Sequence, residues 1–111
     1  MNKNQITLDT WVLEKFQERL NKVLLKSNKI HSPIVLYRRT IEENDTAIEE
    51  EIATATEKYV VVQIFAYGGF LPLTFHEQHV FTVDEFPIWI AKRGKNMLLQ
   101  CLDSIDDILT N

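Results

Sequence analysis

A long apolar run, followed directly by two glycines, constrains the fold of this chain more than any other feature. Residues 59–67 read YVVVQIFAY, and such β-branched and aromatic residues favour an extended strand on a packed surface. Gly68-Gly69 comes next, and two glycines can supply the positive φ angles of a two-residue hairpin turn. Residues 70–75, FLPLTF, then alternate like a returning strand. The sequence therefore predicts a β-hairpin here. Because proline lacks an N–H, the strand that holds Pro72 should lie at a sheet edge or direct that position outward.

Amphipathic helical patterns lie on both sides of this hairpin in the sequence. The first is predicted to begin near Thr10, capped by Thr7 or Asp9, and to end at Ser27-Asn28. The second runs from residue 95 to 109. Apolar residues recur at helical spacing in both, at Leu13, Phe16, Leu20, Val23 and Leu24 and again at Leu98, Cys101, Leu102, Ile105, Ile108 and Leu109.

Shorter elements connect these parts. Residues 33–39 are predicted to form a first strand, residues 76–79 a polar turn, and residues 80–83 a further strand. Thr82 and Glu85 have the spacing of a capping box, so a short helix beginning at Pro87 is expected before Gly94, although residues 88–91 also fit a short strand.

Length and composition indicate one folded unit. The 111 residues are 45% apolar and 25% charged, which is typical of a folded domain with its own core. We therefore expect a single α+β domain over residues 1–111. An antiparallel sheet of about four strands should carry the N- and C-terminal amphipathic helices on one face. The most buried strand positions are expected to be found among Val61, Val62, Ile64 and Phe65.

An acidic stretch interrupts this pattern between the first strand and the hairpin. Seven of the sixteen acidic residues fall here, namely Glu42, Glu43, Asp45, Glu49, Glu50, Glu51 and Glu57. Thr46 with Glu49 resembles a capping box, and Ile48, Ile52 and Ala55 have helical spacing, which favours a short acidic helix over residues 47–56. The alternative is a long hairpin around Asn44-Asp45, with Ile41 and Ile52 in its strands.

Residue types that carry chemistry are sparse. The three glycines cannot form a phosphate-binding loop, and no serine lies in a nucleophile-elbow context. Cys101 lies on an apolar helical stripe, which indicates a buried structural thiol. His76, Glu77 and His79 lack the spacing of a zinc protease and are interpreted as turn residues. We therefore expect no catalytic site, metal or cofactor.

Charge and cysteine content limit the class of partner and the compartment. The net charge of −4 argues against broad binding to nucleic acid or to an anionic membrane. No apolar run approaches the roughly 20 residues that span a bilayer, and the first residues lack the apolar core of a signal peptide. A single cysteine fits a reducing compartment, so a cytoplasmic protein is expected.

Two functions remain open. The first is a small acidic protein of the immunity or inhibitor kind, which neutralises or regulates another protein with a basic surface. Its contact surface would be the seven acidic residues, with Glu49, Glu50 and Glu51 exposed and contributing to binding rather than to folding. The second is a structural or adaptor subunit that forms a homo-dimer or larger assembly through a sheet edge or through the apolar residues 88–90.

Overall fold

Helices and an antiparallel sheet make up the protein, according to a computed structural model that describes residues 3–44, 46–68 and 71–111. Over those residues there are three helices and four strands, so the predicted α+β class is confirmed. In chain order the elements are α1 (Lys3–Ile30), β1 (Ile34–Glu43), β2 (Ile48–Thr56), β3 (Tyr59–Gly68), β4 (Leu71–Phe81), α2 (Glu85–Lys92) and α3 (Lys95–Thr110). None of these helices is long and apolar enough to cross a membrane.

The strands form a meander in the order β1-β2-β3-β4, with every neighbouring pair antiparallel. The predicted hairpin is the β3–β4 pair, and β4, which contains Pro72, lies at a sheet edge as predicted. Gly68, predicted as the first turn residue, is instead the last residue of β3 and pairs with Leu71, while Gly69, the second residue of the predicted turn, lies outside the described residues. A Cβ on Gly68 would lie only 2.0 Å from the carbonyl oxygen of Thr46, so glycine is needed here for space.

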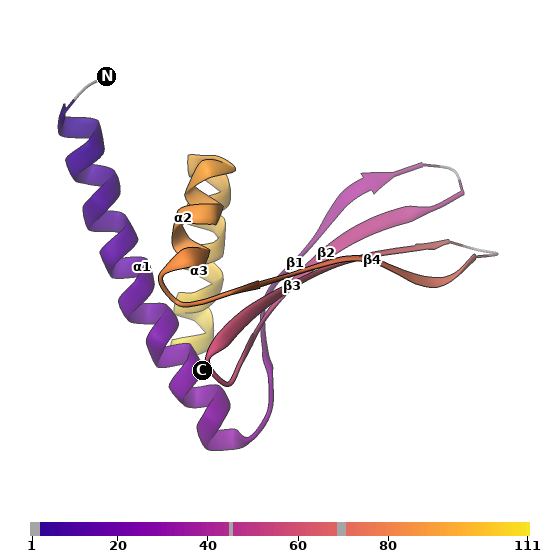
Figure 1. Ribbon diagram of the computed structural model, residues 1–111, viewed down its shortest axis with the longest axis horizontal. Coiled ribbons are helices and arrows are strands. Elements are labelled where there is room, and N and C mark those ends of the chain that lie inside the picture. Colours follow the sequence, from indigo (N-terminus) through magenta and orange to yellow (C-terminus); the bar gives the residue numbers. More distant parts are fainter. Residues whose placement is uncertain (1–2, 45, 69–70) are drawn as a thin grey trace.

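The helices pack on one face of the sheet and gather near one end of the strands (Figure 1). On this face Ala53 pairs with Val62 and Ala55 with Val60, and all four side chains are fully buried. The helices complete the core with the apolar residues Phe16, Leu20, Val23, Leu24, Phe86, Ile90, Leu98, Cys101, Leu102 and Ile105. Figure 1 also shows the far ends of both hairpins, β1–β2 and β3–β4, extending beyond the helices.

The long helix α1 differs from its predicted bounds at both ends. It begins at Lys3 rather than near Thr10, since no proline or glycine interrupts the chain before residue 30. Its C-terminal cap lies at His31 rather than at Ser27-Asn28. His31 has a φ of 53°, and the N–H of Ser32 donates to the carbonyl of Ser27 at 3.2 Å, which is the geometry of a Schellman cap.

The acidic stretch forms strands, so the expected helix over residues 47–56 is wrong and the alternative hairpin is confirmed. The side chain of Asn44 closes the turn, because its Oδ1 accepts hydrogen bonds from the backbone N–H groups of Thr46 and Ala47 at 2.9 and 2.8 Å. Along β2 the buried residues alternate with partly exposed ones from Glu51 onward. This two-residue period places Ile48 and Ile52 on one face and Ala55 on the other, which a helix would not do.

The segment after the β3–β4 turn also differs in part. Residues 76–79 continue strand β4 instead of forming a polar turn. Residues 77–79 pair with β3, and the register shifts between Ile64 and Phe65. The capping box is confirmed. The backbone N–H of Thr82 donates to Glu85 Oε1 at 2.9 Å, and the N–H of Glu85 donates to Thr82 Oγ1 at 3.3 Å. These two hydrogen bonds cap the N-terminus of α2, as the sequence predicts.

Candidate protein-binding surface

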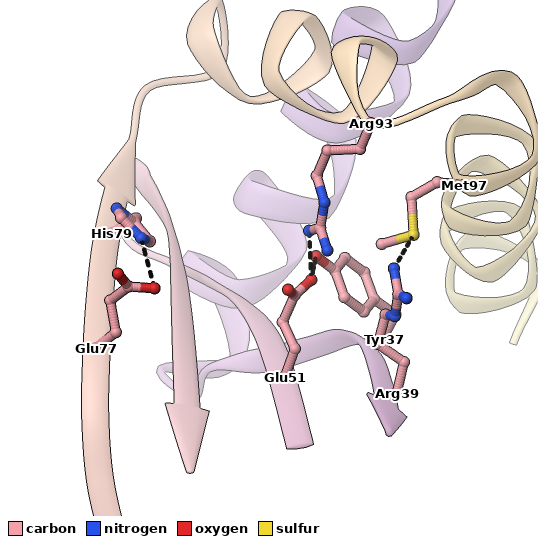
Figure 2. A network of polar contacts seen from close by, with 7 residues as sticks. All are labelled: Tyr37, Arg39, Glu51, Glu77, His79, Arg93 and Met97. Atoms are coloured by element: carbon pink, nitrogen blue, oxygen red, sulfur yellow. Dashed lines mark hydrogen bonds and ion pairs between the residues drawn. The ribbon is translucent and has the colours of Figure 1, made fainter. Parts of the chain in front are cut away.

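A buried carboxylate anchors the acidic hairpin to the helical layer. Glu51 of β2 is only 2% exposed, and its Oε2 accepts hydrogen bonds from Tyr37 Oη at 2.5 Å and from Arg93 Nη1 at 2.6 Å. Arg93 follows α2, and its guanidinium lies 4.6 Å from the ring centre of Trp89. Figure 2 shows Arg93 reaching down from the helical layer to meet the Glu51 and Tyr37 side chains from the sheet.

The charges of this cluster are fixed by their surroundings. Burial raises the pKa of Glu51, but the hydrogen bonds from Arg93 and Tyr37 outweigh burial and hold that pKa below its ordinary value. Burial, reinforced by the carboxylate of Glu51, raises the pKa of Tyr37, and the same carboxylate raises the pKa of Arg93. Glu51 is therefore ionised, Tyr37 is neutral, and every partner in the cluster is engaged. Such a closed network suits a structural joint rather than a reacting group.

The neighbouring carboxylate, Glu50, points to the opposite face of the sheet. It lies 3.2 Å from Arg38 Nε and accepts a hydrogen bond from Tyr67 Oη at 3.1 Å. Arg38 and Arg39 at the end of the predicted first strand are thus set beside acidic residues of β2, one on each face. Glu50 and Glu51 have local basic partners and are not available as free charges.

The tip of the hairpin is different. Glu42 and Glu49 are cross-strand partners and Glu43 pairs with Ile48, yet no ion pair among the described residues involves any of these three carboxylates. Like charges directly opposite each other in a sheet are destabilising. The tip therefore keeps an unfavourable pair that the described part of the chain does not neutralise. We call Glu42, Glu43 and Glu49 the acidic tip.

The structure thus divides the seven predicted binding residues. Glu42, Glu43 and Glu49 form the acidic tip, and Asp45 lies outside the described residues. Glu50 is paired and its side chain is only 13% exposed, so the expected exposure is wrong for Glu50 as well as for Glu51. Glu57 is exposed but lies in the β2–β3 connection, at the opposite end of β2 from the acidic tip.

The other candidates from the sequence are separate from this surface. His79 of β4 lies 3.2 Å from Glu77, a pair drawn in Figure 2, and its ring is also close to Trp89. Within residues 3–44, 46–68 and 71–111, no group of three or more His, Cys, Asp or Glu side chains is arranged to hold a metal ion. Cys101 is buried as predicted, and burial raises the pKa of its thiol to about 12, which keeps it protonated at neutral pH.

Two members of the Glu51 cluster were missed by sequence reasoning. Tyr37 was interpreted as an ordinary strand residue, and Arg93 lies 42 positions from Glu51 in the chain. No local pattern connects residues at that separation. One sequence signal pointed to Arg93. It is a cation directly before Gly94 at the end of an apolar helix, where its guanidinium needs either water or a carboxylate as a partner.

No protein-family model, curated protein or solved structure matches the chain.

Proposed function

We propose that this protein is a small cytoplasmic binding module of the immunity or inhibitor kind, which neutralises or regulates a partner protein through the acidic tip of its β1–β2 hairpin. The partner would present a basic surface, because Lys and Arg side chains are what the carboxylates of the acidic tip attract. Binding, rather than catalysis, is the activity proposed.

The observation that carries this proposal is the unneutralised charge of the acidic tip. Arg38 and Arg39 sit beside Glu50 and Glu51, but the matching positions nearer the turn place Glu42 opposite Glu49. Cross-strand pairs of like charge cost free energy in the isolated protein. A cationic partner removes that cost when it binds, so the same charges that oppose folding favour association.

The Glu51 cluster supports the proposal by holding the hairpin in place. Its bonds connect β1 and β2 to the end of α2, and the hairpin extends from that joint beyond the helices (Figure 1). A preorganised contact surface loses less conformational entropy on binding than a mobile loop does. The seven acidic residues of the prediction therefore have at least two roles, since Glu51 supports the hairpin and the tip offers charge.

A capture experiment with matched variants tests the proposal. Wild-type protein is immobilised beside a tip variant, Glu42→Gln with Glu43→Gln and Glu49→Gln. The control changes three exposed acids that have no ion pair in the described residues, and it carries the same net charge as the tip variant. Its substitutions are Glu14→Gln, Asp103→Asn and Asp107→Asn.

The proposal predicts that wild type and control retain the same protein from lysate, that the tip variant does not, and that salt releases the captured protein. The retained protein is then identified by mass and purified. Equal retention by all three baits, or loss from both variants alike, would mean that the acidic tip is not the contact surface.

A further inference from the structure

The face of the sheet opposite the helices carries apolar side chains interspersed with polar ones. Cross-strand register places Val35, Thr54, Val61 and Val80 in one row and Arg38, Ile52, Gln63 and Gln78 in the next. The following row contains Thr40, Glu50, Phe65 and Phe75. None of these twelve residues is buried, whereas the helix-facing residues between them in β2 and β3 include the sheet's core. We call these three rows the open face.

The open face has both raised and hollowed parts. Val35, Phe75 and Val80 are 50%, 51% and 52% exposed, and they lie on the edge strands β1 and β4. Between them is a depression of about 450 Å³, lined by Arg38, Glu50, Ile52, Phe65 and Tyr67. An exposed aromatic residue such as Phe75, which packs edge-on against Phe65 at 5.7 Å, is costly to leave in water.

The strand sequence matches a sheet that is covered on both faces. A strand with one solvated face alternates apolar and polar residues, whereas a strand covered on both faces is apolar almost throughout. β3 reads YVVVQIFAYG, and on the open face Val61 and Phe65 lie on either side of the polar Gln63. The helices cover only the other face, so Val61 and Phe65 lack a covering layer.

We propose that a second copy of this chain covers the open face, so that two sheets stack face to face in a symmetric dimer. Charge distinguishes this occupant from a basic partner. The three rows contain one cation and one anion, Arg38 and Glu50, whose ion pair leaves the open face neutral although the chain has a net charge of −4. A neutral face that holds both signs is complementary to itself, and a two-fold contact requires a surface of that kind.

Shape and size agree with this occupant. In a two-fold arrangement the exposed Phe75 side chain of each copy can occupy the depression beside Phe65 of the other copy. Strand spacing and rise give the three rows a planar area on the order of 400 Å². Stable complexes bury about 800 Å² per partner, so this smaller contact predicts a weak dimer that forms at micromolar concentration. The dimer contact is separate from the acidic tip and does not depend on the partner proposed above.

The experiment is sedimentation velocity on the full chain from low to high micromolar concentration. Wild type should approach twice the 13.0 kDa mass of one chain. Phe75→Glu should remain a monomer, because two buried carboxylates would face apolar side chains. Leu25→Glu is the matched control, since Leu25 is an equally apolar, exposed residue on α1, and it should dimerise like wild type.

A charge exchange makes the test independent of folding defects. Arg38→Glu alone makes the open face acidic and Glu50→Arg alone makes it basic, so each variant should be monomeric by itself. Mixing the two variants should restore a dimer, which a misfolded chain cannot do. A wild type that stays monomeric at every concentration would overturn the proposal. A dimer that persists in Phe75→Glu, or a mixture that fails to associate while the wild type dimerises, would also overturn it.

Discussion

Removing the cation from the Glu51 cluster should destabilise the protein more than removing the anion. Arg93→Met keeps most of the side-chain volume but leaves the buried carboxylate of Glu51 with only Tyr37 as a close donor. Breaking a buried ion pair in this way costs about 3–5 kcal/mol. Glu51→Gln should cost less, about 1–3 kcal/mol, because an amide oxygen still accepts both hydrogen bonds. The guanidinium of Arg93, with its side chain 26% exposed, can also turn toward water.

The assay is urea unfolding of both single variants and the double variant at neutral pH. Once Glu51 is an amide, Arg93→Met no longer leaves a buried charge. The double variant should therefore lose less free energy of unfolding than the sum of the single variants, by more than about 1 kcal/mol. Additive losses, or a loss below about 1 kcal/mol for Arg93→Met, would mean that Glu51 is not left as an uncompensated buried charge.

The dependence on pH has a definite sign. In wild type the pKa of Glu51 is held below its ordinary value of 4.5, so the cluster contributes fully above pH 4.5 and its contribution is lost as pH falls through the folded-state pKa. Without Arg93, burial becomes the dominant influence and raises that pKa. The deficit of Arg93→Met relative to wild type should therefore be greatest at neutral pH and shrink in acid.

Two further predictions follow from close packing. Gly68→Ala should cost about 1–3 kcal/mol in urea unfolding, because the new Cβ would meet the carbonyl oxygen of Thr46 and force the two hairpins apart; an unchanged midpoint would contradict the contact. Cys101 should react with a thiol reagent at mildly alkaline pH only as fast as the protein opens, since burial raises the pKa of its thiol to about 12. Rapid labelling of the folded protein would show that the thiol is accessible.

Local signals in the sequence predicted the elements whose contacts are local. The stripe from Leu98 to Leu109 specifies a helix through contacts one turn apart, and the Thr82–Glu85 capping box is complete within four residues. The run ending at Gly68 predicted the β3–β4 hairpin for the same reason. The formation of these elements depends little on contacts with the rest of the chain.

The acidic stretch could not be assigned locally because two conformations share its spacing. Ile48 and Ile52 lie four residues apart, which places them on one face of a helix and equally on one face of a strand. Pairing with β1 and β3 decides in favour of the strand. Glu51 is buried with Arg93 as its partner. Arg93 is far away in the sequence and reaches Glu51 only because α2 packs over the sheet, so the sequence alone did not predict the role of Glu51.

The sequence did not show which residues of β3 face away from the helices. Val61, Val62, Ile64 and Phe65 were expected to include the most buried positions, and Val62 is fully buried. The other three are only partly buried. Val61 and Phe65 point away from the helices, and Ile64 lies one row beyond the fully buried Val62, between Glu51 and Glu77. The apolar sequence of β3 predicted a buried strand, but the helices bury only the residues that face them.

Association kinetics with the captured partner test whether the acidic tip guides binding. The rate constant for association is measured at rising ionic strength for wild type, for the tip variant and for the control that lacks three acids on the helices. We predict that wild type and control associate at similar rates that fall steeply with salt. The tip variant should be slower by about tenfold or more at low salt and nearly insensitive to salt. If the tip variant matches the control at every ionic strength, the acidic tip does not guide binding and the proposed function is wrong.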